Sequence, residues 1–202
     1  MSEVLLLGIW YGEVSQLSLD ELKNSLLSVQ DERECILLIV EIMKKGDFSV
    51  KNLLIDLMNQ TEDEAVLNLC IRLFCSVCTN DDLKDVNNFR FLDSVEVGNL
   101  YTDVVKTKNL DCYYYNTSLA FPGLFTQEIM TALYVAAQKK EKYHLYLQSS
   151  LLSIYSGEKV PVDTNVVISR DEIDLMISYI DRLIKKHWVE GMKYFYGHPV
   201  EN

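Results

Sequence analysis

Apolar residues recur at the spacing of amphipathic helices along the first third of the chain, and short polar segments with helix-start signals separate them. Ser18 followed by Glu21 has the spacing of a capping box and predicts a helix to about Ser28. Asp31 predicts the start of a second helix. That helix is expected to end at Gly46, directly after two lysines that complement its C-terminal carbonyls.

Two further helices are predicted directly downstream. Ser49 is expected to open the third helix, and Thr61 with Glu64 forms another predicted capping box that opens the fourth. The fourth helix is expected to run through Phe74. The inward positions predicted for the third helix are Leu53, Leu54, Leu57 and Met58.

The sequences of these four helices resemble two copies of one helical-hairpin repeat. A shift of 31 residues pairs Ser18 with Ser49, Leu22 with Leu53, Leu26 with Leu57, Leu27 with Met58, Ile36 with Leu67, Val40 with Ile71 and Met43 with Phe74. Short amphipathic helices cannot bury their apolar faces alone, whereas stacked hairpins bury a continuous core. We therefore predict a mainly α fold with stacked, HEAT-like helical hairpins in residues 1–108. The alternative is that any two helical hairpins share an apolar period.

The rest of the chain, residues 109–202, is predicted to be a smaller helical part that can include short strands and packs on the first part as one unit. Aromatic-rich irregular sequence with a Pro-Gly turn marks the boundary at 109–123. Helices are predicted at 95–105 and 126–139, and a mixture of extended chain and short helix at 145–154. Ser169 with Glu172 is a capping box that predicts a long helix to about His187.

The net charge of −11 is concentrated in the first half of the chain, where residues 1–101 contain 8 Lys/Arg and 18 Asp/Glu. Residues 102–202 contain 11 and 12, respectively. A strongly negative surface repels nucleic-acid phosphates and attracts basic proteins. We therefore expect a basic protein partner and no nucleic acid. The alternative is that the charge serves solubility alone.

The chain carries no recognisable catalytic or metal-binding signature. Cys75 and Cys78 have the spacing of half a zinc site, but no second CxxC or His pair completes it. The three histidines are far apart, and phosphate-loop, HExxH and GxSxG motifs are absent. These observations predict a non-enzymatic protein without cofactors or metals. The lack of a signal peptide and of a long apolar run, together with five cysteines in apolar surroundings, predicts a cytoplasmic protein that does not bind membranes.

Carboxylates gather at the predicted helix starts, and in a stacked array equivalent starts would share one edge. This pattern predicts an acidic protein-binding rim flanked by aromatic anchors. The candidate residues are Asp31, Glu32, Glu34, Glu62, Asp63, Glu64, Asp81, Asp82, Asp85, Tyr113, Tyr114 and Tyr115. A second aromatic set, Tyr194–Tyr196, is more typical of half-buried packing residues. Each carboxylate taken alone is also explained by helix capping.

Four segments carry a resemblance to a known family: Ile9–Gly12, Ala65–Leu83, Leu151–Val162 and Lys193–His198. Their sequences (IWYG, AVLNLCIRLFCSVCTNDDL, LLSIYSGEKVPV and KYFYGH) resemble a bacterial immunity-protein family of polymorphic toxin systems, the one numbered forty-seven. The resemblance departs after residues 90–92, which implies a shorter helical array.

The resemblance implies a cytoplasmic antidote that binds and blocks a cognate toxin. Taken with the acidic rim, it predicts inhibition by steric and electrostatic means. The alternative hypothesis is a helical-repeat adaptor or scaffold with a basic partner unrelated to toxins.

Overall fold

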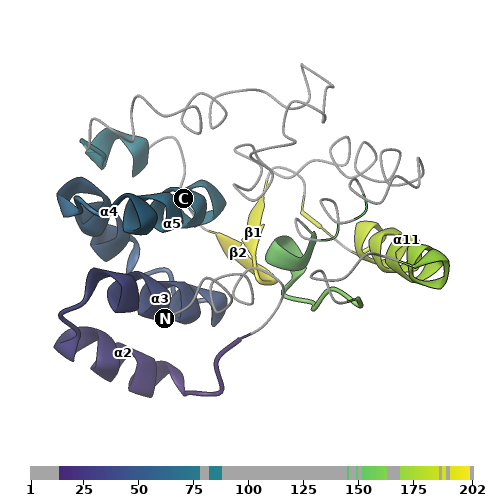
Figure 1. The fold of residues 1–202 in the computed structure, drawn as a ribbon, viewed down its shortest axis with the longest axis horizontal. Coiled ribbons are helices and arrows are strands. Elements are labelled where there is room, and N and C mark those ends of the chain that lie inside the picture. The colour runs from purple at the N-terminus through teal and green to yellow at the C-terminus, as the bar shows by residue number, and fades with distance from the viewer. Residues whose placement is uncertain are drawn as a thin grey trace.

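The computed structural model describes residues 14–77, 82–87, 145, 149, 152–162, 169–186, 188–189 and 192–200. Its elements are α2 (Leu19–Ser28), α3 (Glu32–Lys44), α4 (Lys51–Gln60), α5 (Glu64–Val77), the 3-10 helix η1 (Asp82–Asp85), α11 (Arg170–Ile184), β1 (Lys193–Phe195) and β2 (His198–Val200). The described chain is mainly helical with a small antiparallel sheet (Figure 1), which confirms the predicted fold class.

Several predicted features lie outside the described residues, among them the helices at 95–105 and 126–139 and the boundary segment at 109–123. The division into residues 1–108 and 109–202 stays a prediction. The described residues at 145–154 are helical, so the extended piece predicted there is not seen among them.

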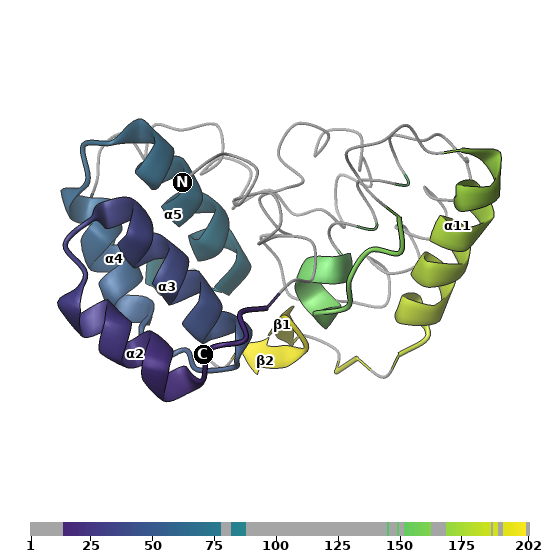
Figure 2. The same cartoon turned by 60° about the horizontal axis from the view of Figure 1, so that its bottom comes forward.

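The first four helices form two antiparallel hairpins. α2 packs against α3 and α4 against α5, while α3 contacts both helices of the second hairpin. In Figures 1 and 2 these four helices lie together on one side of the molecule, with α2 outermost and the β1–β2 hairpin between them and α11. This arrangement agrees with the predicted pair of hairpins, whereas a HEAT-like mode of stacking stays a prediction.

Two of the predicted helix starts in this region are confirmed. Ser18 and Glu21 form the full capping box of α2, in which each side chain bonds the other residue's backbone N–H. Asp31 caps α3 by accepting a hydrogen bond from the backbone N–H of Glu34 at 2.9 Å. Gly46, with φ of +84°, ends that helix as predicted.

The other two predicted starts are wrong. The residue before α4 is Val50, whose side chain makes no capping bond, and Ser49 instead donates its backbone N–H to Asp47. The start of α5 is capped by Asp63, which accepts from the N–H groups of Ala65 and Val66. Thr61 ends α4, and its hydroxyl bonds to Glu32 across the hairpins.

Burial corrects the register of the repeat for the outer helices α2 and α4. In the predicted register Leu22 is buried but its counterpart Leu53 is 46% exposed, and Leu27 is 87% exposed although its counterpart Met58 is buried. Lengthening the shift by a single position instead pairs the buried residues Leu22 and Leu54 and the capping residues Asp31 and Asp63, and we call this the corrected register. The inner helices α3 and α5 keep the predicted register, which pairs the buried residues Ile36, Val40 and Met43 with the buried residues Leu67, Ile71 and Phe74. The longer shift would pair Ile36 with Asn68 and Val40 with Arg72.

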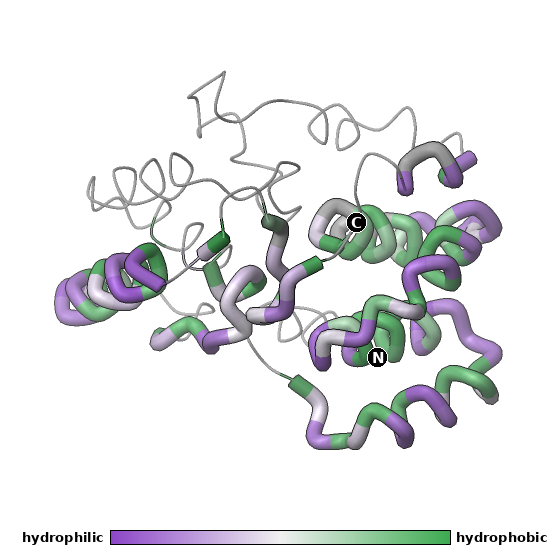
Figure 3. The backbone as a smooth tube through the Cα atoms, turned by 180° about the vertical axis from the view of Figure 1, so that it is seen from behind, coloured by the Kyte–Doolittle hydropathy of each residue, from purple (hydrophilic) through white to green (hydrophobic). Residues whose placement is uncertain are grey.

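The core lies along α3 and α5, which are predominantly apolar in Figure 3, whereas α2 and α11 alternate between apolar and polar residues. Apolar burial of this kind contributes most of the stabilisation of such a fold. The fully buried residues of the two inner helices include Ile36, Ile39, Ile42, Met43, Val66, Cys70, Leu73, Phe74 and Val77.

The C-terminal hairpin joins the helical array to the rest of the chain. Phe195 of β1 pairs with His198 of β2, and the two residues between them, Tyr196 and Gly197, both have positive φ, as in a type I′ turn. Their backbone N–H groups donate to the carbonyls of Ile154 and Tyr155 at 2.6 and 2.7 Å. The turn thereby supplies partners for carbonyls in the last turn of the helical segment 152–156.

Close backbone approach requires glycine around this turn. Gly157 has φ of +71°, and a Cβ atom there would lie 2.9 Å from the carbonyl oxygen of Tyr196. Phe195 and Tyr196 are buried in the same core cluster as α3 and α5. The interpretation of the C-terminal aromatic set as packing residues agrees with this burial.

The long C-terminal helix α11 begins with the predicted capping box of Ser169 and Glu172. It ends at Ile184, slightly before the predicted end at His187. Its buried face consists of Met176, Tyr179, Ile180 and Leu183.

Candidate protein-binding edge

Six of the candidate carboxylates lie at the starts of α3 and α5, and we call them the acidic edge: Asp31, Glu32, Glu34, Glu62, Asp63 and Glu64. Carboxylates are favoured there because the first N–H groups of a helix carry partial positive charge. Asp31 and Asp63 satisfy this requirement directly as capping residues, whereas Glu34 and Glu64 have exposed side chains.

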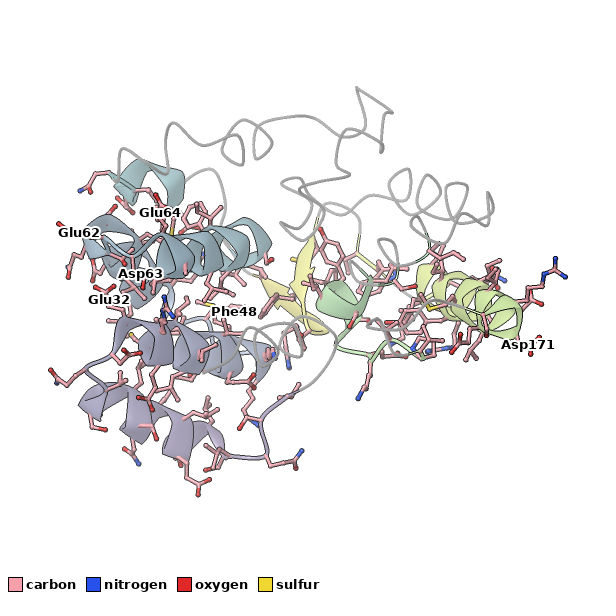
Figure 4. All side chains as sticks on the ribbon, in the orientation of Figure 1. Glu32, Phe48, Glu62, Asp63, Glu64 and Asp171 are labelled. Atoms are coloured by element: carbon pink, nitrogen blue, oxygen red, sulfur yellow. The ribbon has the colours of Figure 1, made fainter. Side chains whose placement is uncertain are left out.

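Two contacts bring the starts of α3 and α5 together. Arg33 donates from Nη2 and Nε to one carboxylate oxygen of Asp63, at 2.9 and 3.2 Å. The hydroxyl of Thr61 donates to Glu32 at 2.6 Å. Figure 4 accordingly shows Glu32, Glu62, Asp63 and Glu64 at the same end of the helical array. The predicted alignment of the first two acidic groups is therefore present in the fold.

The electrostatics of the edge are set by one arginine among six carboxylates. The hydrogen bonds from Arg33, together with those from the Ala65 and Val66 backbone, lower the pKa of Asp63, which stays ionised at neutral pH. Glu34 and Glu64 are exposed, and Glu62 also reaches the surface of this edge. The edge therefore retains a net negative charge that a basic surface can complement.

Of the third acidic group, the described residues Asp82 and Asp85 lie along α4 and belong to the 3-10 helix η1. Asp82 forms an ion pair with Lys51, in the first turn of α4, at 2.9 Å. The carbonyl of Asp85 accepts a hydrogen bond from Asn59, in the last turn of that helix, at 3.0 Å. Asp85 is thus near the turn that leads into the acidic edge, whereas Asp82 is held at the far end of α4.

Four of the predicted site residues lie outside the described residues: Asp81 and the three tyrosines Tyr113, Tyr114 and Tyr115. Their role as partner-binding residues stays a prediction, as does that of the carboxylates. Sequence reasoning did not identify Arg33 or Thr61 as the residues that join the two helix starts. The corrected register pairs the capping aspartates Asp31 and Asp63, and this pairing would have indicated that the two helix starts lie next to each other.

A comparison with protein families gives a family model described as Immunity protein 47, which matches residues 6–96 and 93–200. The chain belongs to the Immunity protein 47 family. The resemblance inferred from the four motifs is thereby confirmed. The two matched segments overlap at residues 93–96, just after residues 90–92, where the sequence predicts a departure from the family pattern. No curated protein and no solved structure matches the chain.

The described residues of this Immunity protein 47 member contain no group of three or more His, Cys, Asp and Glu side chains arranged to hold a metal ion. Cys70 is fully buried, and burial raises the pKa of its thiol far above the usual range. Burial likewise raises the pKa of Cys35, so neither thiol is activated as a nucleophile at neutral pH. Cys78 and the side chain of Cys75 lie outside the described residues.

None of the helices in the described part of this family member combines the length and hydropathy that a bilayer span requires. The predicted cytoplasmic location rests on the sequence alone.

Proposed function

We propose that this protein binds a cognate bacterial toxin and neutralises it by covering the toxin's active site, with the acidic edge docked on a basic toxin surface. Membership of the Immunity protein 47 family, matched over nearly the whole chain, carries this proposal. Immunity proteins generally act by binding, so the inhibition requires no chemistry from this chain. The site of action would be the cytoplasm of the cell that makes the toxin.

The geometry of the acidic edge supports the electrostatic part of the proposal. Two helix starts that belong to different hairpins converge on one edge, and several of their carboxylates are exposed. Complementary charge accelerates the encounter of two proteins more than it lengthens the lifetime of the complex. The acidic edge should therefore govern the association rate.

The test of neutralisation is co-expression. Candidate toxins encoded beside the gene for this protein are each expressed in a host cell with and without this protein. For one of them we expect growth with the protein and arrest without it, and continued arrest with every candidate would refute the proposed function. Binding of the purified, catalytically inactivated toxin to the protein is then measured by surface plasmon resonance at several salt concentrations.

The test of the acidic edge compares two double charge reversals. Glu34→Lys with Glu64→Lys changes the edge without removing a capping residue, and Asp82 is left unchanged because Lys51 holds it. Asp171→Lys with Asp174→Lys makes the same change in charge at exposed positions on α11, remote from the edge (Figure 4).

We expect the edge variant to associate with the toxin about tenfold more slowly at low salt, with a weaker dependence on salt, while the α11 variant stays close to the wild type. Equal association rates for the two variants would show that the acidic edge is not the docking surface.

A further inference from the structure

Leu27, in the last turn of α2, has the most exposed large apolar side chain among the described residues, at 87%. The other large apolar residues that are exposed in this part of the chain range from 36% to 48%. α2 ends where α3 begins, so Leu27 lies at the same end of the first hairpin as Asp31 and Glu34. The apolar side chain of Leu27 is therefore exposed to solvent beside the acidic edge.

The second hairpin shows what covers the equivalent position. The corrected register relates Leu27 to Asn59 of α4. The Asn59 side chain donates to the carbonyl of Asp85 at 3.0 Å and accepts from the N–H of Asn87 at 2.7 Å. Val86, between these two residues, is buried in the core cluster. A segment of the chain itself therefore packs on the second hairpin at this position.

The first hairpin has a leucine at this position instead of a hydrogen-bonding amide. A leucine cannot hold the peptide groups of a covering segment as Asn59 does, but it can contact an apolar side chain or pocket. Removing a leucine side chain from water is favourable, and the gain grows with the apolar area that is covered. Exposure of Leu27 in the unbound protein leaves this contribution for an intermolecular contact.

The charges around Leu27 indicate the chemistry of the partner. The last turn of α2 has no basic residue, and its C-terminal carbonyl groups carry partial negative charge. The exposed carboxylates of Asp31 and Glu34 follow at the start of α3. A complementary surface must therefore present lysine or arginine around an apolar contact point.

We infer that Leu27 is an anchor of the toxin-binding surface, inserted into an apolar recess of the toxin that lysine or arginine side chains border. This inference rests on the proposed function and adds a division of roles to it. The acidic edge accelerates association, and Leu27 slows dissociation because its desolvated side chain must be returned to water.

The experiment measures dissociation of the inactivated toxin, as identified by the co-expression test, from the wild type and from the variants Leu27→Ala, Leu27→Met and Leu175→Ala. Leu175, on α11, is 48% exposed and serves as the matched control. We expect Leu27→Ala to dissociate about tenfold faster with little change in association rate, and the other two variants to stay within about twofold of the wild type. Thermal melting confirms that each variant is folded.

The outcomes separate this inference from the proposed function. If the wild type does not bind the toxin, the proposed function fails and the inference fails with it. If the wild type binds and Leu27→Ala dissociates at the wild-type rate, only the inference is overturned. The inference is also overturned if the free protein is a dimer that Leu27→Ala converts to a monomer, because a second copy would then cover the position.

Discussion

The two ends of α3 contain the same types of charged residue in opposite environments. At its start, Asp31 and Glu34 are exposed beside the equivalent carboxylates of α5. At its other end, the side chain of Lys44 is fully buried. Its ammonium group pairs with Glu41 at 2.8 Å and lies 4.9 Å from the centre of the Tyr196 ring. Charged residues of one helix therefore have two roles: the buried ones stabilise the fold, and the exposed ones are accessible to a partner.

The two environments indicate where on α3 a partner can bind. At the buried end, Glu41 also accepts from the backbone N–H of Ser15, and Lys45 donates to the carbonyl of the same residue. The C-terminal hairpin covers this end, so its charges are already satisfied within the chain. At the exposed end, Arg33, Asp63 and Asp31 have partners within the chain, whereas the side chains of Glu34 and Glu64 face solvent and are accessible to another protein.

The largest expected effect concerns the hairpin that closes the buried end. Replacement Phe195→Ala removes a fully buried ring from the core and should lower the free energy of unfolding by about 3–5 kcal/mol. Guanidinium unfolding followed by circular dichroism measures the change. The matched surface variant Leu27→Ala should cost less than about 0.5 kcal/mol. Similar values for the two variants would contradict the placement of the hairpin in the core.

A smaller effect is expected from the buried ion pair. Lys44→Met keeps the length of the side chain but leaves the carboxylate of Glu41 without its closest cation, which should cost about 2 kcal/mol. Lys186→Met removes a more exposed partner of Glu158 and should cost less than about 0.5 kcal/mol. Equal costs would mean that burial does not change how strongly the fold depends on an ion pair.

The pair of Lys23 and Asp47, which joins α2 to the loop after α3, gives a dependence on pH. Hydrogen bonds from Lys23 and Ser49 lower the pKa of Asp47 from 3.8 to about 2. Because the folded-state pKa is depressed, the stabilisation is present above pH 4 and is lost as the pH falls from about 4 to about 2.

Asp47→Asn should therefore cost about 1 kcal/mol at pH 7, after allowance for the exposed Lys23, and almost nothing at pH 2. Unfolding of both proteins by urea across this pH range measures the difference. Asp56→Asn, at an exposed position of α4, is the control and should show no such convergence. A constant difference between Asp47→Asn and the wild type at all pH values would contradict the ion pair.

The smallest expected effect on stability is at the exposed end. Glu34→Lys with Glu64→Lys should lower the free energy of unfolding by no more than about 1 kcal/mol, because lysine in a first turn opposes the helix dipole. The α11 control, Asp171→Lys with Asp174→Lys, should change stability by a similar amount. Thermal melting measures both variants. A much larger loss of stability for Glu34→Lys with Glu64→Lys than for the α11 control would show that the acidic edge stabilises the fold.

Sequence reasoning succeeded where a signal is local. The capping boxes at Ser18 and Ser169 and the cap at Asp31 depend on side chains that bond N–H groups three residues away. Reasoning failed at Thr61, which has the right spacing for a cap but ends α4, while Asp63 caps α5 in its place. The Thr61 hydroxyl donates to Glu32 and accepts from the backbone N–H of Asp63. The pattern of apolar residues likewise does not distinguish the exposed Leu27 from Leu26, which packs against the core.

The amino-acid sequence alone is enough to predict the helical class, the positions of most of the described helices and membership of the family, because these depend on local capping, apolar period and recurring motifs. Only the tertiary structure decided which charges are exposed, which are paired, and which leucine stands in water. Those properties arise from contacts between residues far apart along the chain, and the local pattern does not encode such contacts.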